Sequence, residues 1–260
     1  MINIENHIIL DKVETWPDKV LNLIENSKKE LNNFLQEERR IDKLGEKDIL
    51  IRLQCNRPQN IYSEEWNRTI KNINKILKGY NIIGIHCTKL MDYEILDILE
   101  NGLQPLNKIF ANQRVERLYK KGLISQATKN ELENKDELCC EHRNGYIFVF
   151  HCLSTLKDES GLNRLFGYWG GESLYAYLKN PRELKQIGTS CIVFTSIKIK
   201  ELAIDPELSK RMIASYFDDN YYPHDTDSII QSKLNVIKVI TRKEKLFEDL
   251  TNIQNWKDEI

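Results

Sequence analysis

The sequence predicts an α+β fold in which a mainly helical N-terminal region precedes a domain of mixed helices and strands. Within residues 1–79, apolar side chains recur at helical spacing with charged residues between them. From Tyr80 onward the pattern changes to short apolar runs, typical of buried strands, which helices of unequal length separate. Because no regular strand–helix–strand period is present, we expect an α+β architecture and not a doubly wound parallel sheet.

Residues 1–79 contain two predicted helices. Apolar residues at helical spacing predict the first over Asp18–Arg40. Ser63 is placed to cap the second, and Gly79 to end it. Between them, the apolar run Ile49–Leu53 predicts a short strand. We therefore expect residues 1–79 to be a helical region without catalytic residues.

Residues 80–260 contain most of the predicted strands. Asp92 is expected to cap a helix that ends before Gly102, where a left-handed C-cap belongs. Two more helices are expected in residues 107–138, separated near Gly122 and restarting at Ser125. Four apolar runs predict strands, and these are Ile82–Cys87, Tyr146–Cys152, Cys191–Ile199 and Leu234–Ile240.

Composition argues against several classes of protein. Lys and Arg number 38 and Asp and Glu 39, a net charge of −1, which argues against a nucleic-acid coat or a membrane-surface protein. No apolar run approaches the roughly 18 residues that cross a bilayer, and the N-terminus lacks the pattern of a signal peptide. The 6 cysteines are irregularly spaced, which fits reduced thiols better than a disulfide framework. We expect a cytoplasmic protein without a membrane partner.

His86 ends the first apolar run of residues 80–260 and is followed by Cys87 and Thr88. A histidine at the carboxyl edge of a buried strand can bind a ligand. A polar residue at a strand end can equally face water or bond to the backbone. The residues alone leave both interpretations open.

A second unusual segment places two large aromatic residues and two glycines directly before Glu172. This aromatic-glycine segment comprises Tyr168, Trp169, Gly170 and Gly171. The glycines let the backbone approach a flat ligand closely, while the rings can stack on it. The Glu172 carboxylate stands where a helix is expected to begin, so it can also stabilise the helix through its dipole. The two glycines favour a site.

Soft metal ligands also occur, at Cys139, Cys140, His142, His151 and Cys152. No CxxC pair is present, and adjacent cysteines seldom bind one metal together. Successive strand positions such as His151 and Cys152 point to opposite faces. We expect no metal site. Glycine-rich phosphate loops are also absent from the sequence.

The segment Ile85–Thr88, followed by a helix that ends in Ile98–Leu103, resembles the opening of ADP-ribosyltransferases, including the poly-ADP-ribose polymerases. In that family a strand ends in His-x-Thr or His-x-Ser, and a helix ending in Gly-Leu follows. The RNA 2′-phosphotransferases, which also handle NAD, share this opening. The strand Tyr146–Cys152 and the aromatic-glycine segment lie where the family has its second strand, tyrosine and following helix. The resemblance covers about residues 80–240.

This resemblance implies that residues 80–260 form a split β-sheet ADP-ribosyltransferase-like core that takes NAD as its substrate and needs no metal. His86, with Cys87 beside it, would hold the adenosine ribose, and Thr88 would help to fix the nicotinamide side. Either Tyr168 or Tyr146 would stack on the nicotinamide. We further expect the NAD site to include Arg164, Trp169, Gly170 and Gly171.

The family's catalytic glutamate stabilises the positive charge that develops on the ribose as nicotinamide leaves. It usually begins a late strand, where this chain has Gln231. Either Glu172 supplies the carboxylate from another direction, or Gln231 marks altered chemistry in the NAD site. We favour Glu172 as the catalytic residue, with His86 and Tyr168.

The resemblance implies a mono-ADP-ribosyltransferase, a glycosyltransferase that modifies a macromolecule, either protein or nucleic acid. By analogy, a small stand-alone transferase rich in Asn, Lys and Ile suggests a bacterial toxin or antiphage defence effector, with an inhibitory partner protein. One alternative is an RNA 2′-phosphotransferase, which needs basic residues on a phosphate; the sequence offers Arg143 and Arg164. The other is a catalytically inactive module that binds NAD-like ligands or a protein partner.

Overall fold

The structure is a computed structural model that describes residues 7–49, 53, 55–133, 144–171, 174, 178–202, 206–218 and 227–256. It divides into two compact units: unit 1 comprises residues 1–82 and 198–226, and unit 2 comprises residues 83–197 and 227–260. The chain combines helices with a largely antiparallel sheet, so the fold is α+β as predicted. The described residues 198–202 and 206–218 belong to the same compact unit as the N-terminal residues, and the sequence-based division at residue 80 groups them with the second domain.

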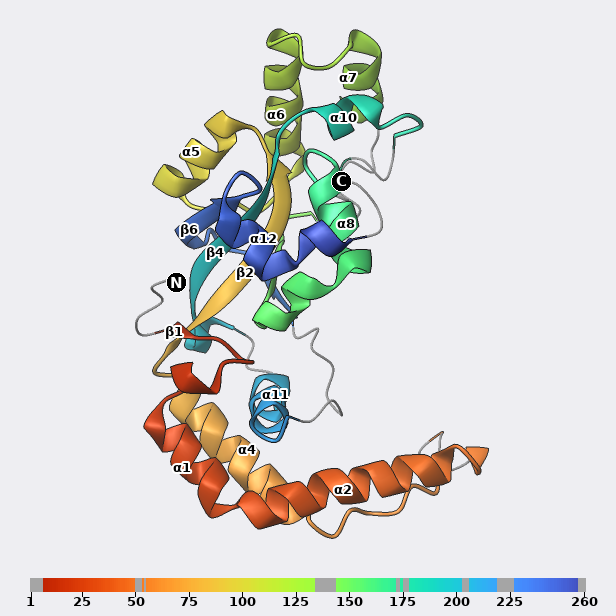
Figure 1. The fold of residues 1–260 in the computed structure, drawn as a ribbon, viewed down its shortest axis with the longest axis vertical. Helices are drawn as coiled ribbons and strands as arrows, with labels where there is room; N and C mark the ends of the chain where they lie inside the picture. Colours follow the sequence, from red (N-terminus) through yellow and green to blue (C-terminus); the bar gives the residue numbers. More distant parts are fainter. Residues whose placement is uncertain are drawn as a thin grey trace. The chain divides into compact units, whose positions relative to one another are not determined.

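Unit 1 is mainly helical (Figure 1). Helix α4 contacts α1, α2 and α11, and its residues Trp66, Ile70, Ile73 and Leu77 are buried. Trp66 stacks on Phe34 of α2 with ring centroids 4.2 Å apart. The described elements of unit 1 are β1 (His7–Ile8), η1 (Val13–Thr15), α1 (Asp18–Asn26), α2 (Lys28–Gly45), α4 (Ser63–Leu77), η3 (Ile199–Glu201) and α11 (Pro206–Tyr216).

Two details of unit 1 differ from the sequence-based expectation. The single helix predicted over Asp18–Arg40 is interrupted at Ser27, whose hydroxyl donates to Glu65 Oε1 on α4 over 2.9 Å. In the predicted strand Ile49–Leu53, the Leu53 amide donates to the Ile49 carbonyl over 2.8 Å. That bond spans four residues along one chain, as in a helical turn and not in a strand, and residues 50–52 lie outside the described residues.

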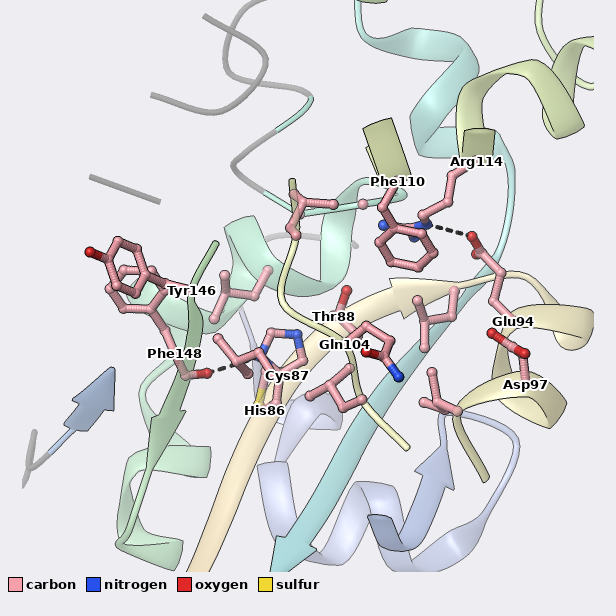
Figure 2. Close-up of a pocket in the computed structure, with 18 of the residues that line it drawn as sticks. His86, Cys87, Thr88, Glu94, Asp97, Gln104, Phe110, Arg114, Tyr146 and Phe148 are labelled. Carbon is pink, nitrogen blue, oxygen red and sulfur yellow. Dashed lines mark hydrogen bonds and ion pairs between the residues drawn. The ribbon is translucent and has the colours of Figure 1, made fainter. Parts of the chain in front are cut away.

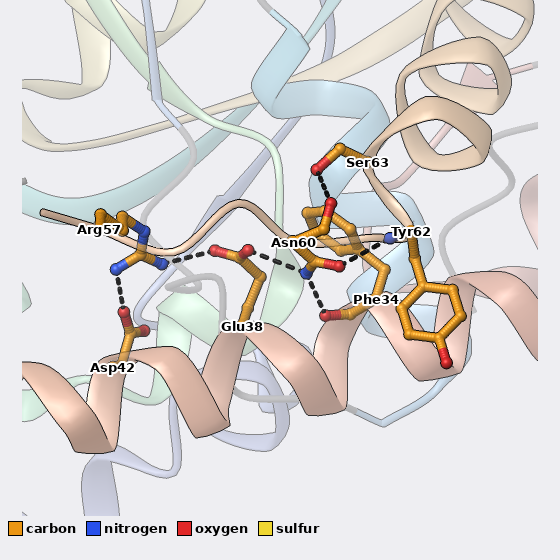
Figure 3. Close-up of polar contacts among 7 residues, drawn as sticks. All are labelled: Phe34, Glu38, Asp42, Arg57, Asn60, Tyr62 and Ser63. Atoms are coloured by element: carbon orange, nitrogen blue, oxygen red, sulfur yellow. Dashed lines mark hydrogen bonds and ion pairs between the residues drawn. The ribbon is translucent and has the colours of Figure 1, made fainter.

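The segment before α4 is fastened to α2 by a chain of polar contacts (Figure 3). Arg57 donates to Glu38 over 2.7 Å and to Asp42 over 2.6 Å. The buried Asn60 amide donates to the Phe34 carbonyl over 3.0 Å and to Glu38 over 2.9 Å. This segment therefore has polar partners along α2 although it has no regular secondary structure.

Unit 2 contains most of the sheet, in the strand order β5-β3-β2-β4-β6, with β1 pairing to the first residues of β2. The pairs β2–β3, β3–β5 and β4–β6 are antiparallel. Strands β2 and β4 lie side by side at the centre (Figure 1). The strands are β2 (Asn81–Leu90), β3 (Ile147–Phe150), β4 (Thr189–Lys198), β5 (Asp227–Ile230) and β6 (Asn235–Thr241).

A close approach between β2 and β4 depends on Gly84. The Thr195 hydroxyl on β4 donates to the Gly84 carbonyl over 3.0 Å. A Cβ atom at Gly84 would lie 2.6 Å from Thr195 Oγ1 and from a methyl carbon of Ile197, which is too close for a non-bonded contact. Glycine at this position is therefore needed for the packing beside the central strand pair.

The helices of unit 2 include the three predicted between the first two strands, α5, α6 and α7, and three that the sequence analysis did not predict, α8, α10 and α12. Gly102 ends α5 with φ of +77°, as predicted for a C-cap. Helix α6 packs with α7, and Trp169 and Leu184 join their buried apolar residues in one cluster. The described helices of unit 2 are α5 (Asp92–Asn101), α6 (Lys108–Lys120), α7 (Gln126–Glu133), η2 (Leu153–Lys157), α8 (Glu159–Gly167), α10 (Arg182–Gln186), α12 (Lys245–Thr251) and η4 (Ile253–Asn255).

Candidate functional site

Unit 2 contains a cavity of about 550 Å³ between β2, β3, α5, α6, α8 and the residues that follow α8 (Figure 2). This volume lies within the range of about 300–1,000 Å³ that small-molecule and cofactor sites occupy. His86, Thr88 and Leu90 line it from alternate positions of β2. Because side chains alternate along a strand, these three residues share one face of the sheet.

His86 is held in one orientation by the neighbouring strand. Its Nδ1 lies 2.9 Å from the carbonyl oxygen of Phe148 on β3. A carbonyl can only accept a hydrogen bond, so Nδ1 carries the proton and donates it. Burial lowers the pKa of His86; the Phe148 carbonyl opposes this shift, and the positive charge of Arg114 adds to it. The ring is therefore neutral at pH 7, and its Nε2 is a hydrogen-bond acceptor for a ligand hydroxyl.

Cys87 and Thr88 follow His86 at the cavity. Thr88 is buried, with 6% of its surface exposed. Burial raises the pKa of the Cys87 thiol well above its usual value, so the thiol stays protonated and is a poor nucleophile. The hydroxyl of Thr88 and Nε2 of His86 are thus the polar groups that this strand contributes to a ligand.

Lys89 holds the aromatic-glycine segment against the end of β2. Its ammonium donates to the Lys185 carbonyl over 2.6 Å and to the Gly167 carbonyl over 3.3 Å. Its own carbonyl accepts from the Gly170 amide over 3.2 Å. Residues far apart in sequence are therefore joined at this edge of the cavity by contacts to one strand residue.

Gly170 and Gly171 line the cavity with left-handed backbone, at φ of +79° and +67°. A Cβ atom at Gly170 would clash with a methyl carbon of Leu174, whereas one at Gly171 would meet nothing within 4 Å among the described residues. Both positions favour glycine because other residues rarely adopt this backbone conformation. Because both glycines line the cavity, the backbone here leaves room for a ligand to approach it.

The aromatic residues of the predicted site are distributed differently from the expectation. Tyr146 lines the cavity beside Phe148, as Figure 2 shows. Tyr168 is half-buried and packs against the apolar cluster of α6 and α7. Trp169 is fully buried in that cluster, so it has no surface on which a ligand could stack. Of the two tyrosines proposed to stack on nicotinamide, Tyr146 is therefore the one that lines the cavity.

Four other residues of the sequence analysis lie away from the cavity or outside the described residues. Arg164 on α8 is exposed, and Gln231 is exposed just after β5; neither lines the cavity. Glu172 lies outside the described residues, directly after Gly171 of the cavity lining. Arg143 also lies outside them.

The structure adds a buried polar cluster that sequence reasoning missed. Glu94, on the first turn of α5, accepts three hydrogen bonds: from Arg114 Nε over 2.7 Å, from Trp169 Nε1 over 2.7 Å and from the Met91 amide over 2.9 Å. Arg114 in turn lies over the Trp169 ring, 4.5 Å from its centroid. Glu94 and Trp169 thus orient the guanidinium of Arg114 at the cavity.

Helix α6 turns one face toward the cavity. Phe110, Gln113, Arg114 and Arg117 all line it. Their spacing of three and four residues places them on the same side of a helix. That spacing is visible in the sequence and could have identified the face, although not what it covers.

The candidate metal ligands are not brought together within the described residues. His151 is fully buried, with one ring nitrogen 2.8 Å from the Ile83 carbonyl and the other 2.7 Å from the Ser228 hydroxyl. Cys139, Cys140 and His142 lie outside the described residues. In the part of unit 1 and unit 2 that is described, no group of three or more His, Cys, Asp or Glu side chains is placed to hold a metal ion.

None of the described helices is both long and apolar enough to span a membrane.

Comparisons with known proteins assign no family. No protein-family model matches the chain, and neither a curated protein nor a solved structure matches it.

Proposed function

We propose that this protein transfers ADP-ribose from NAD to a macromolecular acceptor, protein or nucleic acid. The observation that carries the proposal is the placement of His86, whose Nδ1 is bonded to the Phe148 carbonyl while the ring lines a cavity of about 550 Å³. An imidazole held in this way accepts a hydrogen bond from a ribose hydroxyl. The resemblance at Ile85–Thr88 and Ile98–Leu103 supports NAD as the source of that ribose.

In the proposed reaction the bond between nicotinamide and the ribose C1′ breaks, and both bonding electrons leave with nicotinamide. Positive charge then develops on the ribose. A nucleophilic atom of the acceptor forms the new bond to C1′ and loses its proton. A carboxylate next to the ribose accelerates this step because it opposes the developing charge.

Glu172 is our proposed source of that carboxylate. Its neighbour Gly171 lines the cavity, which supports this choice over Gln231, an exposed residue that does not line it. Tyr146, which lines the cavity, is the better candidate of the two tyrosines to stack on nicotinamide. We also propose that unit 2 has the split β-sheet form of the ADP-ribosyltransferases.

The proposed protein is an NAD-dependent mono-ADP-ribosyltransferase of the toxin or antiphage kind, cytoplasmic and controlled by an inhibitory partner. One observation favours a second candidate, the RNA 2′-phosphotransferase. That class needs basic side chains on a phosphate, and α6 contributes Arg114 and Arg117 to the cavity.

The test is to incubate the full chain with NAD labelled in its adenylate part, with and without cell lysate and with 2′-phosphorylated RNA. We expect label on a macromolecule of the lysate together with release of nicotinamide. Removal of the RNA 2′-phosphate would select the second candidate. NAD binding without turnover under all conditions would contradict both and favour the inactive module.

A further inference from the structure

The α6 side of the cavity presents two guanidinium groups to a ligand, those of Arg114 and Arg117. Of the acidic side chains there, Glu94 is engaged by three donors of the protein, and Asp97 is exposed and accepts from Asn101 over 2.8 Å. Arg114 and Arg117 line the same side. Although the formal charges of these four side chains cancel, the two guanidinium groups offer N–H donors that Glu94 does not engage, and such donors favour an anionic ligand.

Arg114 is the most constrained of these donors. Its Nε is bonded to Glu94 over 2.7 Å, and its guanidinium lies over the ring of Trp169, 4.5 Å from the centroid, and over the ring of Phe110, 5.8 Å from the centroid. Its Nη2 is buried from solvent and has no hydrogen-bond partner among the described residues. A buried donor without a partner is costly, so a ligand atom that accepts from Nη2 would be bound favourably.

Tyr93 and Arg117 extend the same surface. The Arg117 guanidinium lies 3.7 Å from the centroid of the Tyr93 ring. The Tyr93 hydroxyl is also buried without a hydrogen-bond partner among the described residues. Burial raises the pKa of Tyr93, and the Glu94 charge acts in the same direction while Arg117 and Arg114 oppose it. The phenol therefore keeps its proton at neutral pH and can donate it to a ligand oxygen.

We propose that Arg114, Arg117 and Tyr93 form a subsite that binds the phosphate oxygens of the ligand, which in the proposed reaction are those of the NAD diphosphate. The planar guanidinium matches the geometry of two phosphate oxygens, and Arg114 is oriented before the ligand arrives. His86 lines the same cavity and would hold the ribose. The identity of the ligand rests on the proposed function, whereas the affinity of these side chains for phosphate does not.

The experiment measures binding of four probes to the full chain by calorimetry: NAD, ADP-ribose, adenosine and inorganic pyrophosphate. For Arg114→Gln we expect about tenfold to hundredfold weaker binding of ADP-ribose and pyrophosphate, and unchanged binding of adenosine. Arg117→Gln keeps the Glu94 ion pair, so it serves as the second variant if Arg114→Gln does not fold. Because Arg117 is exposed, we expect a smaller loss, about threefold to tenfold.

Lys120→Gln is the matched control, because it removes one positive charge from the same helix at an exposed position that pairs with Glu116 and does not line the cavity. Affinity for every probe should stay as in the wild type. A loss as large as that of Arg117→Gln would show a general charge effect and overturn the subsite. Equal binding of ADP-ribose to the wild type and both arginine variants would overturn it as well, while leaving the proposed function intact.

Two further outcomes separate the subsite from the proposed function. Pyrophosphate binding that depends on Arg114, without any binding or turnover of NAD, would support the subsite and contradict the transferase. If 2′-phosphorylated RNA then bound in the same Arg114-dependent way, the phosphate would come from RNA. Failure of the wild type to bind NAD, ADP-ribose, pyrophosphate or this RNA would overturn both.

Discussion

Replacing Glu94 with glutamine should destabilise unit 2, because this position requires a side chain that only accepts hydrogen bonds. One carboxylate oxygen accepts from Arg114, and the other accepts from Trp169 and the Met91 amide. A glutamine of the same shape has one oxygen and one NH₂ group. Whichever way the amide is turned, its NH₂ faces an N–H donor, and at least one bond of the cluster is lost.

The expected loss of stability follows from burial. Only 9% of the Glu94 side chain and 14% of the Arg114 side chain are exposed, so water can replace the lost bonds only in part. A hydrogen bond to a charged group contributes about 1.5–3 kcal/mol, and breaking a buried ion pair costs about 3–5 kcal/mol. We therefore expect Glu94→Gln to lower the free energy of unfolding by about 2–4 kcal/mol. This corresponds to a fall in Tm of about 4–15 °C for a chain of this size.

The assay is thermal and urea unfolding followed by tryptophan fluorescence and circular dichroism. Asp97→Asn is the matched control, since it makes the same carboxylate-to-amide change on α5 at an exposed position. A surface substitution of this kind should change stability by no more than about 0.5 kcal/mol. If Glu94→Gln were as stable as Asp97→Asn, the cluster would not hold Arg114 as we have argued.

Further predictions concern the proposed reaction and a buried histidine. His86→Ala should weaken NAD binding about tenfold to hundredfold in calorimetry, and unchanged affinity would remove the ribose-binding role. Glu172→Gln should lower kcat about 10²–10³-fold with little change in KM. A normal kcat with a slightly lower Tm would instead identify Glu172 as a helix-stabilising carboxylate and move the catalytic assignment to Gln231. Burial lowers the pKa of His151 to about 4 from 6.5, so the folded state binds fewer protons than the unfolded state between these values. The resulting stability, about 3 kcal/mol, should be present above pH 6.5 and lost as the pH falls toward 4. Unfolding of the wild type and of His151→Asn across this range checks it, and an identical pH dependence of the two proteins would contradict the reasoning.

Local patterns in the sequence predicted much of the secondary structure. The apolar runs predicted strands that overlap β2, β3, β4 and β6, and apolar spacing with helix-end signals predicted α5, α6 and α7. These features depend on residues close together in the chain, so periodicity captures them. The break at Ser27 was missed, since the partner of its hydroxyl, Glu65, belongs to another helix. Similarly, the clustering of α11 with the N-terminal helices depends on contacts with α4.

The candidate site likewise combines features that the sequence predicted with features that only the tertiary structure determines. The sequence by itself pointed to the His86 strand and the two glycines, whose residue types carry their chemistry within a short segment. It also pointed to Trp169 as a ligand contact, but a buried indole N–H needs an acceptor, and that acceptor is Glu94, 75 positions away in the chain. Only the tertiary structure decided that Trp169 is buried and that Arg114 faces the cavity. The physical reason is that a hydrogen bond between distant residues depends on how the elements pack, which spacing along a single element does not encode.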